Sequence, residues 1–223
     1  ALGLSLRGYR PVAEIQFDGF VFPAFNQITT QLSRVHSRTN GQYRVPVTIR
    51  LPYGGAVGAI EHHSESPEAY FAHTPGLRVL APSSAHDAYW MTRTAIAHPD
   101  PVILLEPKRR YWLKGDVDRE ETTYNPFKAA VLREGSNLTL VTHGPLVPMA
   151  LAAAEAAQED GHDIEVVDLR SISPLDIDTI ASSVARTGRL VIAQEAYNFV
   201  SVGSEIAAAV SERCFFSLEA PVI

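Results

Sequence analysis

The sequence predicts an α/β protein built from two doubly wound domains, each with a sheet covered by helices on both faces. Short apolar stretches of strand length alternate with helical stretches along most of the 223 residues, and this alternation is typical of parallel sheets. The chain is 46% hydrophobic, so it can bury two cores. A polar region interrupts the alternation near the middle. We therefore expect a first domain over 1–115, a linker over 116–134 and a second domain over 135–223.

The first half contains four predicted strands separated by helices. Apolar runs of strand length cover 11–17, 45–50, 77–81 and 102–106, and a helical stretch leads from 20–25 to Val35. Ser83 and Ser84 precede a second helical stretch over 86–97, and serine is a preferred residue for capping a helix.

The second half repeats this alternation. Strands are predicted over 138–142, 164–168 and 189–193, and helices over 148–160, 174–186 and 203–213. Gly161 can end the first of these helices, and Ser173 followed by Pro174 can begin the second. A further short strand is expected over 215–218. Single helices between successive strands predict right-handed crossovers.

Composition narrows the class of protein. The net charge is −6, so nucleic acid and anionic membranes are poor candidate partners. Cys214 is the single cysteine and cannot form an internal disulfide, and no apolar run approaches the roughly 20 residues that span a bilayer. These features favour a soluble, cytoplasmic protein. Residues 1–6 read as the middle of a helix without an initiator methionine, and we expect both domains to be truncated.

Two adjacent histidines, His62 and His63, occupy a glycine-flanked loop between predicted strands. Histidine is the side chain best suited to proton transfer near neutral pH. The pattern alone leaves three interpretations open: ordinary surface or core histidines, acid–base residues, or metal ligands. Neighbouring side chains in an extended segment point in opposite directions, so a shared metal is disfavoured.

Gln16 and Phe20 lie four residues apart around the end of the first predicted strand, where α/β sheets bind ligands. From spacing alone they also fit an edge polar residue and a core aromatic residue. The glycines over 54–58 lack the register of a phosphate loop and predict a flexible turn. A charged set near two strand ends is interpreted as solvated or bridging a subunit interface; it comprises Arg50, Glu106, Lys108, Arg109 and Arg110.

Four segments carry a resemblance to a known family: 13–18, 59–82, 101–108 and 168–176. Together they resemble the beta subunit of the thiamin-diphosphate-dependent 2-oxo acid dehydrogenases, within the transketolase-like superfamily. The form of 63–76 is more similar to the branched-chain enzyme than to the pyruvate enzyme. The resemblance implies a pyrimidine-binding domain followed by a transketolase carboxyl-terminal-like domain. It also implies oxidative decarboxylation of a branched-chain 2-oxo acid, with acyl transfer to a lipoyl group.

The resemblance assigns roles to particular residues. It implies that His63 helps bind the 2-oxo acid or moves protons during acyl transfer, and that Gln16 lies beside the cofactor. Phe20 matches an aromatic residue, often tyrosine, that packs on the aminopyrimidine ring; phenylalanine keeps the packing face and loses a hydroxyl. The family's essential glutamate is expected a few residues before Ala1.

The resemblance also implies ions and partners. A structural potassium ion would be held mainly by backbone carbonyls, at positions that match Val45, Val47, Ala95, His98 and Asp100. For the last two, solvated turn residues before Pro101 are the plain alternative. Thiamin diphosphate and its magnesium would be held mostly by an alpha subunit, in a heterotetramer of two alpha and two beta chains that serves a lipoyl acyltransferase core. The alternatives are a pyruvate dehydrogenase beta subunit, a transketolase-like fragment, and a non-catalytic assembly module of the same fold.

Overall fold

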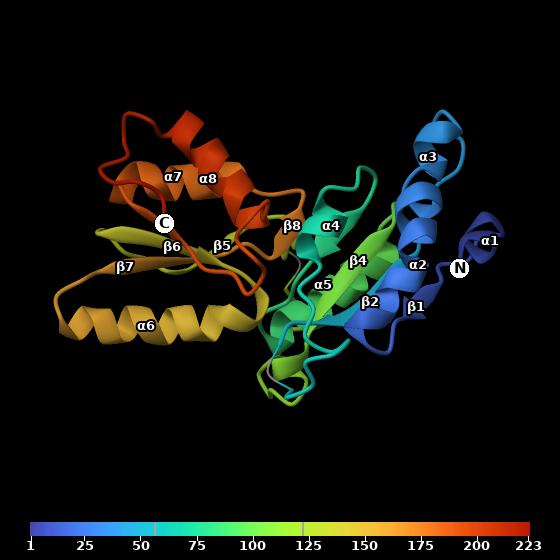
Figure 1. Cartoon of the computed structure of the whole chain (residues 1–223), viewed down its shortest axis with the longest axis horizontal. Coiled ribbons are helices and arrows are strands. Elements are labelled where there is room, and N and C mark those ends of the chain that lie inside the picture. The colour runs from blue at the N-terminus through green and yellow to red at the C-terminus, as the bar shows by residue number, and fades with distance from the viewer. Residues whose placement is uncertain (56, 122) are drawn as a thin grey trace.

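The computed structural model describes residues 1–55, 57–121 and 123–223. They form two neighbouring α/β units, each with its own sheet and helices (Figure 1). The first sheet has the strand order β1-β2-β4-β3-β8, and the second has the order β5-β7-β6-β9. The predicted α/β class with two domains is therefore confirmed. Both sheets are mixed, because β8 runs antiparallel to β3 and β5 runs antiparallel to β7.

The first sheet is formed by short buried strands with helices on both faces. Its strands are β1 (Val12–Glu14), β2 (Thr48–Tyr53), β3 (Arg78–Leu80), β4 (Val102–Pro107) and β8 (Ser171–Ser173). The helices of this half are α1 (Leu2–Leu6), η1 (Asp18–Val21), α2 (Phe22–Asn26), η2 (Gln27–Leu32), α3 (Val35–Arg38), α4 (Glu68–Ala72), α5 (Ala85–Ala97) and η3 (Lys108–Arg110). Ser84 caps α5 by accepting a hydrogen bond from the Asp87 amide, as the sequence predicted.

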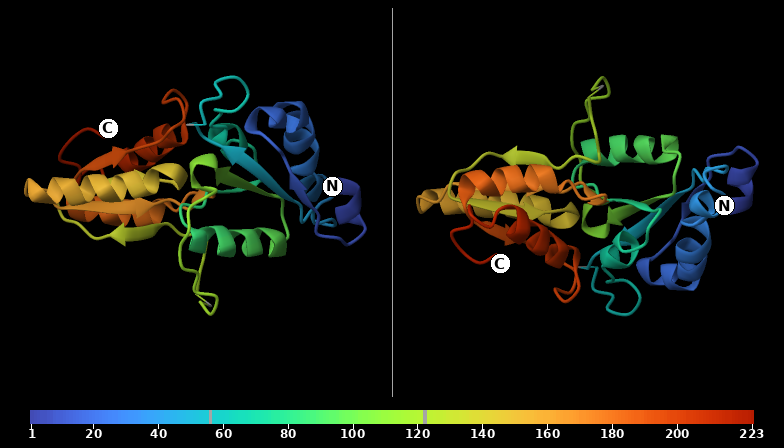
Figure 2. Two further views of the ribbon diagram at one scale, coloured as in Figure 1. Left: turned by 90° about the horizontal axis from the view of Figure 1, so that it is seen from below. Right: turned by 90° about the horizontal axis from the view of Figure 1, so that it is seen from above.

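Alternation along β4 explains why both faces of the first sheet are covered. Val102 and Leu104 pack with Met91 of α5, whereas Ile103 and Leu105 belong to the core that contains η1, η2 and α4. Successive side chains of a strand point to opposite faces, so a strand that is apolar at every position must be buried on both. Figure 2 shows α5 in green on one side of this sheet and the blue amino-terminal helices on the other.

The second sheet is built in the same way. Its strands are β5 (Ala130–Arg133), β6 (Leu138–Thr142), β7 (Ile164–Asp168) and β9 (Leu190–Ile192). Its helices are η4 (Gly144–Leu146), α6 (Val147–Glu159), α7 (Ile177–Thr187) and α8 (Val202–Arg213). Ala154 of α6 packs on Val166, while Ile180 of α7 and Ile206 of α8 pack in the core that contains Val167. Figure 1 shows α6 on one side of the sheet and α7 and α8 on the other.

The predicted start of the helix at Ser173–Pro174 is wrong. Ser173 lies in β8 and pairs with Val79 of β3, and the helix begins only at Ile177. The reason is that Asp176 accepts hydrogen bonds from the Ala129 amide and the Thr179 hydroxyl, which hold the chain at the point where α7 starts. The second half of the chain therefore supplies an edge strand to the first sheet.

Two further stretches bear on the sequence predictions. The strand expected over 215–218 is wrong, because the Ser217 and Leu218 amides both donate to the Cys214 carbonyl and form a turn. β5 lies inside the stretch expected to be a linker, 116–134, and Ala130 pairs with Asp168 of β7. The division into 1–115, 116–134 and 135–223 stays a prediction. Among the described residues, no helix combines the length and apolar character needed to cross a bilayer.

Candidate active site

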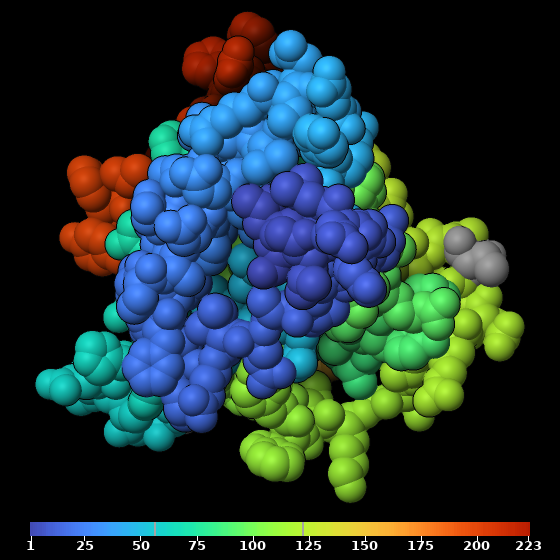
Figure 3. Space-filling view, turned by 90° about the vertical axis from the view of Figure 1, so that its right-hand side faces the viewer, coloured from blue at the N-terminus to red at the C-terminus, as the bar shows by residue number. Residues whose placement is uncertain are grey.

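Polar segments follow three parallel strands where these end at one edge of the first sheet. β1 is paired with β2, and β2 is paired with β4, so their carboxyl ends meet there. The segments that follow are 15–18 after β1, a loop whose described residues are 54–55 and 57–67 after β2, and Lys108 after β4. This is the edge at which α/β sheets bind ligands. In Figure 3 the cyan-to-teal atoms of the loop project beside the blue amino-terminal part of the chain.

A buried ion pair lies beneath this edge. The Nζ atom of Lys108 is 2.8 Å from Oδ2 of Asp18, and the two side chains are 5% and 0% exposed. Lysine and aspartate are almost never this buried unless they are paired. The interpretation of the charged set as solvated or subunit-bridging is therefore wrong for Lys108, whose partner is inside the same chain.

The ion pair also holds the histidine loop. Lys108 Nζ donates to the His63 carbonyl at 2.5 Å, and the Glu65 amide donates to Asp18 Oδ2 at 2.6 Å. The Gly19 amide donates to the His62 carbonyl at 3.0 Å. A Cβ atom at Gly19 would lie 2.8 Å from three atoms of His62, so the close approach of the two backbones requires glycine.

His63 lies among aromatic rings at the centre of this arrangement. Its ring centroid is 4.1 Å from that of Phe17 and 6.1 Å from that of Phe20. Its Nδ1 is 2.7 Å from the His62 carbonyl, which can only accept a hydrogen bond. In the neutral ring the proton is therefore on Nδ1, and Nε2 carries the lone pair that can take a proton from a ligand.

Of the residues predicted to be catalytic or cofactor-binding, the structure brings His63 and Phe20 together. Phe20 lies edge-on to the His63 ring and is 49% exposed, so it is no core aromatic. Gln16 is exposed and precedes Phe17, whose ring packs on His63. The assignments of His63 as catalytic and of Gln16 and Phe20 as cofactor-binding remain predictions.

The five positions predicted for potassium lie before β2 and at the end of α5. Val45 and Val47 are buried, and their carbonyls accept from the Val47 and Val102 amides, respectively. The Ala95 carbonyl accepts from the His98 amide at 3.3 Å, and the His98 carbonyl accepts from Arg10 at 3.1 Å. The Asp100 carbonyl is 3.2 Å from Nδ1 of His98. A carbonyl oxygen has two lone pairs and can accept a second partner. Potassium binding at these positions stays a prediction.

A second polar cluster lies where the two halves meet, and sequence reasoning missed it. His143 Nε2 is 3.3 Å from Glu68 Oε1, with side chains 5% and 1% exposed. Arg109 pairs with Glu195 at 3.1 Å. Burial, followed by the nearby Glu68 and Glu195 carboxylates, raises the pKa of the Tyr53 hydroxyl well above its usual value. These partners are far apart in the sequence, and no local pattern joins them.

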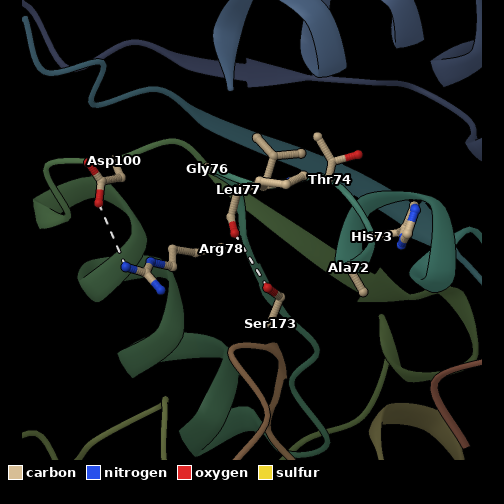
Figure 4. A pocket seen from close by; sticks show the side chains of 9 residues that line it. Ala72, His73, Thr74, Gly76, Leu77, Arg78, Asp100 and Ser173 are labelled. Atoms are coloured by element: carbon tan, nitrogen blue, oxygen red, sulfur yellow. Dashed lines mark hydrogen bonds and ion pairs between the residues drawn. The ribbon is translucent and has the colours of Figure 1, made fainter. Parts of the chain in front are cut away.

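A pocket of about 400 Å³ opens at the opposite edge of the first sheet (Figure 4). Arg78 begins β3 and reaches toward Asp100, 3.8 Å away, and the Ser173 hydroxyl donates to the Leu77 carbonyl. Its position at the amino end of β3 separates this pocket from the His63 loop. Within the described residues, no group of three or more histidine, cysteine, aspartate or glutamate side chains could hold a metal ion.

Comparison with protein families matches almost the whole chain. Residues 1–112 match the pyrimidine-binding domain of transketolase, and residues 127–223 match the transketolase C-terminal domain. A solved structure described as "Split gene transketolase, inactive beta4 tetramer" superposes with a TM-score of 0.80 at 26% identity. That match covers 100% of this chain and 68% of the other.

Several curated proteins are similar over the full length of this chain. A pyruvate dehydrogenase E1 component subunit beta from Leifsonia xyli subsp. xyli is 57% identical, with 66% of its own length covered. A 3-methyl-2-oxobutanoate dehydrogenase subunit beta from Mycobacterium tuberculosis H37Rv is 50% identical, with 64% covered. A pyruvate dehydrogenase E1 component subunit beta from Staphylococcus epidermidis is 43% identical, with 69% covered. The chain thus spans about two thirds of the length of these relatives.

Proposed function

This chain belongs to the transketolase-like beta subunits of 2-oxo acid dehydrogenases, and we propose that it forms the beta half of an enzyme that decarboxylates branched-chain 2-oxo acids. The family predicted from the sequence is confirmed. The observation that carries the proposal is the His63 loop. It is fixed at the ligand-binding edge of the first sheet beside the half-exposed ring of Phe20.

The residues at this edge fit the pyrimidine end of thiamin diphosphate. Phe20 offers an exposed aromatic face, and exposed Gln16 offers an amide that can donate or accept. When bound, the cofactor supplies the electron sink for decarboxylation. In this proposal, an alpha subunit holds most of the cofactor, including its diphosphate and magnesium.

His63 is proposed to hold or move a proton at Nε2 during acyl transfer. The overall reaction converts a 2-oxo acid and a lipoyl disulfide into carbon dioxide and an acylated dihydrolipoyl group. The acyl carbon is oxidised, while the disulfide is reduced to one thioester and one thiol. One sulfur must therefore acquire a proton. With Nδ1 engaged by the His62 carbonyl, His63 in its imidazolium form can give the Nε2 proton to that sulfur, which leaves the neutral ring with its lone pair on Nε2.

We propose that the working enzyme is a heterotetramer of two alpha and two beta chains, which is cytoplasmic and docks on a lipoyl acyltransferase core. Apolar side chains near the site support a covering partner: Phe20, Phe22 and Ile60 are 49%, 42% and 90% exposed. The similar split gene transketolase is described as an inactive beta4 tetramer. By analogy, we expect this beta chain to be active only with its alpha partner.

For the substrate, pyruvate is a specific alternative to the branched-chain 2-oxo acid. The sequence form of 63–76 favours the branched-chain acid, whereas the 57% identical relative is named a pyruvate dehydrogenase subunit. The test is carbon dioxide release from 3-methyl-2-oxobutanoate and from pyruvate. It uses the parent full-length chain co-expressed with its alpha subunit, thiamin diphosphate and magnesium. Preference for the branched acid supports the proposal, and preference for pyruvate replaces the substrate.

A non-catalytic assembly module is the alternative from a different class. The observation that favours this alternative is that a similar solved structure is described as an inactive tetramer. A stable alpha–beta complex that releases no carbon dioxide from either acid would make it the better account.

A further inference from the structure

We propose that Lys108 and Asp18 are positioning residues for His63: their buried ion pair sets the place of the histidine ring without touching substrate or cofactor. This inference rests on the proposed function, because it concerns how the proton-transfer residue is held. The pair also contacts the backbone of the loop directly, so its role can be tested apart from catalysis.

Lys108 begins η3 immediately after a central strand of the first sheet. It follows β4 directly, and β4 is paired with β2 on one side and β3 on the other. Leu104 and Leu105, within that strand, are 1% and 0% exposed. A side chain that starts from such a rigid element can position a second group more accurately than one that starts from a loop. The Lys108 ammonium uses this fixed origin to hold the His63 carbonyl at 2.5 Å.

Asp18 supplies the charge that keeps the Lys108 ammonium in place. Its Oδ2 accepts from Lys108 Nζ at 2.8 Å and from the Glu65 amide at 2.6 Å. Within the described ranges, its Oδ1 is buried without a hydrogen-bond partner, so the carboxylate depends on Oδ2 for its contacts. Removal of either member leaves the other charge buried without compensation. The loop is therefore held at His63 and at Glu65 by one pair.

Hydrogen bonds connect the fixed backbone of the loop to the His63 ring. The Gly19 amide fixes the His62 carbonyl at 3.0 Å, and that carbonyl faces His63 Nδ1 at 2.7 Å. Lys108 fixes the next carbonyl along the chain. The His62 carbonyl thus determines which ring nitrogen carries the proton, and the contact of Lys108 with the His63 carbonyl fixes the backbone from which the ring projects.

The test compares Lys108→Met, His63→Ala and the double variant in the parent chain assembled with its alpha subunit. Methionine keeps the length of the lysine stem and removes the charge. The matched control is Arg186→Met, which removes a cation from the buried Glu165 carboxylate, 2.5 Å away in the second sheet. We expect Lys108→Met to lower acyl transfer to a lipoyl domain by roughly 10- to 100-fold, because small misplacements of reacting groups cost about that much.

Non-additivity separates positioning from simple stabilisation. In the His63→Ala background, Lys108→Met should lower the remaining rate by no more than about twofold, since residues that act as a unit are not additive. The limb of the pH–rate profile that disappears in His63→Ala should also shift in Lys108→Met but not in Arg186→Met. Equal losses in both backgrounds, or an unchanged profile, would overturn the proposal.

Hydrogen exchange provides a readout that does not depend on turnover. We expect the Gly19 and Glu65 amides of the assembled protein to exchange at least about tenfold faster in Lys108→Met than in Arg186→Met, because only the former loses the hold on this loop. Unchanged exchange would contradict the inference. If wild-type protein shows no turnover while exchange responds as expected, the proposed function fails and the positioning of the loop stands. If Lys108→Met does not assemble, Asp18→Asn, which keeps the side-chain shape, carries the same two measurements with the same outcomes.

Discussion

The Ser83 hydroxyl lies 2.5 Å from Oδ2 of Asp168, and this contact joins the segment before α5 in the first half to the end of β7 in the second. The same hydroxyl is 3.0 Å from Asp87 Oδ2. Asp168 and Asp87 are 0% and 4% exposed, so two carboxylates share one neutral donor away from water. Burial raises the pKa of Asp168 from 3.8 to about 6, and the nearby Asp87 charge adds to the rise.

This raised pKa predicts a specific dependence of stability on pH. Between pH 3.8 and about 6 the native state binds the Asp168 proton more tightly than the unfolded chain does. The stabilising contribution is therefore present below pH 3.8 and is lost as the pH rises to about 6. The loss amounts to roughly 3 kcal/mol. The free energy of unfolding of Asp168→Asn, minus that of wild type, should rise by up to this amount across the window and stay flat above it.

Urea unfolding at several pH values measures that difference. Asp178→Asn is the control, because its ion pair with Arg213 lies at the surface and its side chain is 79% exposed. Parallel curves for Asp168→Asn and wild type between pH 4 and 6 would show that the Asp168 carboxylate does not titrate in this window.

Replacement of His143 by leucine should destabilise the contact between the two halves. Glu68 Oε1 would lose its partner at 3.3 Å, and its Oε2 is already buried without a hydrogen bond within the described ranges. An unsatisfied buried acceptor costs about 1–3 kcal/mol. The free energy of unfolding at pH 7 should fall by about that amount. His162→Leu, at an exposed position, should have little effect, and equal effects of the two variants would contradict this account.

Phe20→Ala should weaken thiamin diphosphate binding by the assembled enzyme. Loss of an aromatic stacking partner costs about 1 kcal/mol beyond the buried area, so the dissociation constant should rise at least about fivefold. Phe20→Tyr keeps the stacking face and should bind close to the wild-type level. Phe216, which is 98% exposed and belongs to the other half, provides the alanine control. Quenching of protein fluorescence on cofactor addition measures the constants, and unchanged binding by Phe20→Ala would remove Phe20 from the site.

Gly19→Ala should impair the His63 loop while leaving the fold intact. The added Cβ would lie 2.8 Å from the His62 backbone, so this exposed loop must move away. Acyl transfer should fall at least about tenfold, consistent with the sensitivity of catalysis to small displacements. The melting temperature should change by only a few degrees. Gly3→Ala is the control, since its Cβ would have no neighbour within 4 Å. Normal turnover by Gly19→Ala would contradict the close-packing argument.

Local patterns predicted much of this fold because the features they report are local. The apolar run of β4 and the cap at Ser84 were found as expected. Burial on both faces and helix capping each depend on residues that are adjacent in the sequence, so a local pattern can predict them. The start of α7 was misplaced because Ser173 pairs with Val79, and such a pairing leaves no mark in the sequence around Ser173.

The candidate site shows the same limit. His63 and Phe20 could be picked out from a motif and a strand end, and the structure places their rings together. Lys108 was misinterpreted as solvated or interfacial because its partner, Asp18, is 90 residues away. Which distant charge lies beside a lysine is decided by how the strands are ordered in the sheet.

His63→Ala in the assembled alpha–beta enzyme tests most directly whether His63 transfers the proton during acyl transfer. The measurement is the rate of acylation of a lipoyl domain, with subunit assembly checked by sedimentation. His62→Asn is the matched control, because asparagine tolerates the left-handed backbone at that position, where φ is 62°. We predict normal assembly for both variants, a near-normal rate for His62→Asn, and a loss of roughly 10²- to 10⁴-fold for His63→Ala. Wild-type acylation by assembled His63→Ala would contradict the account.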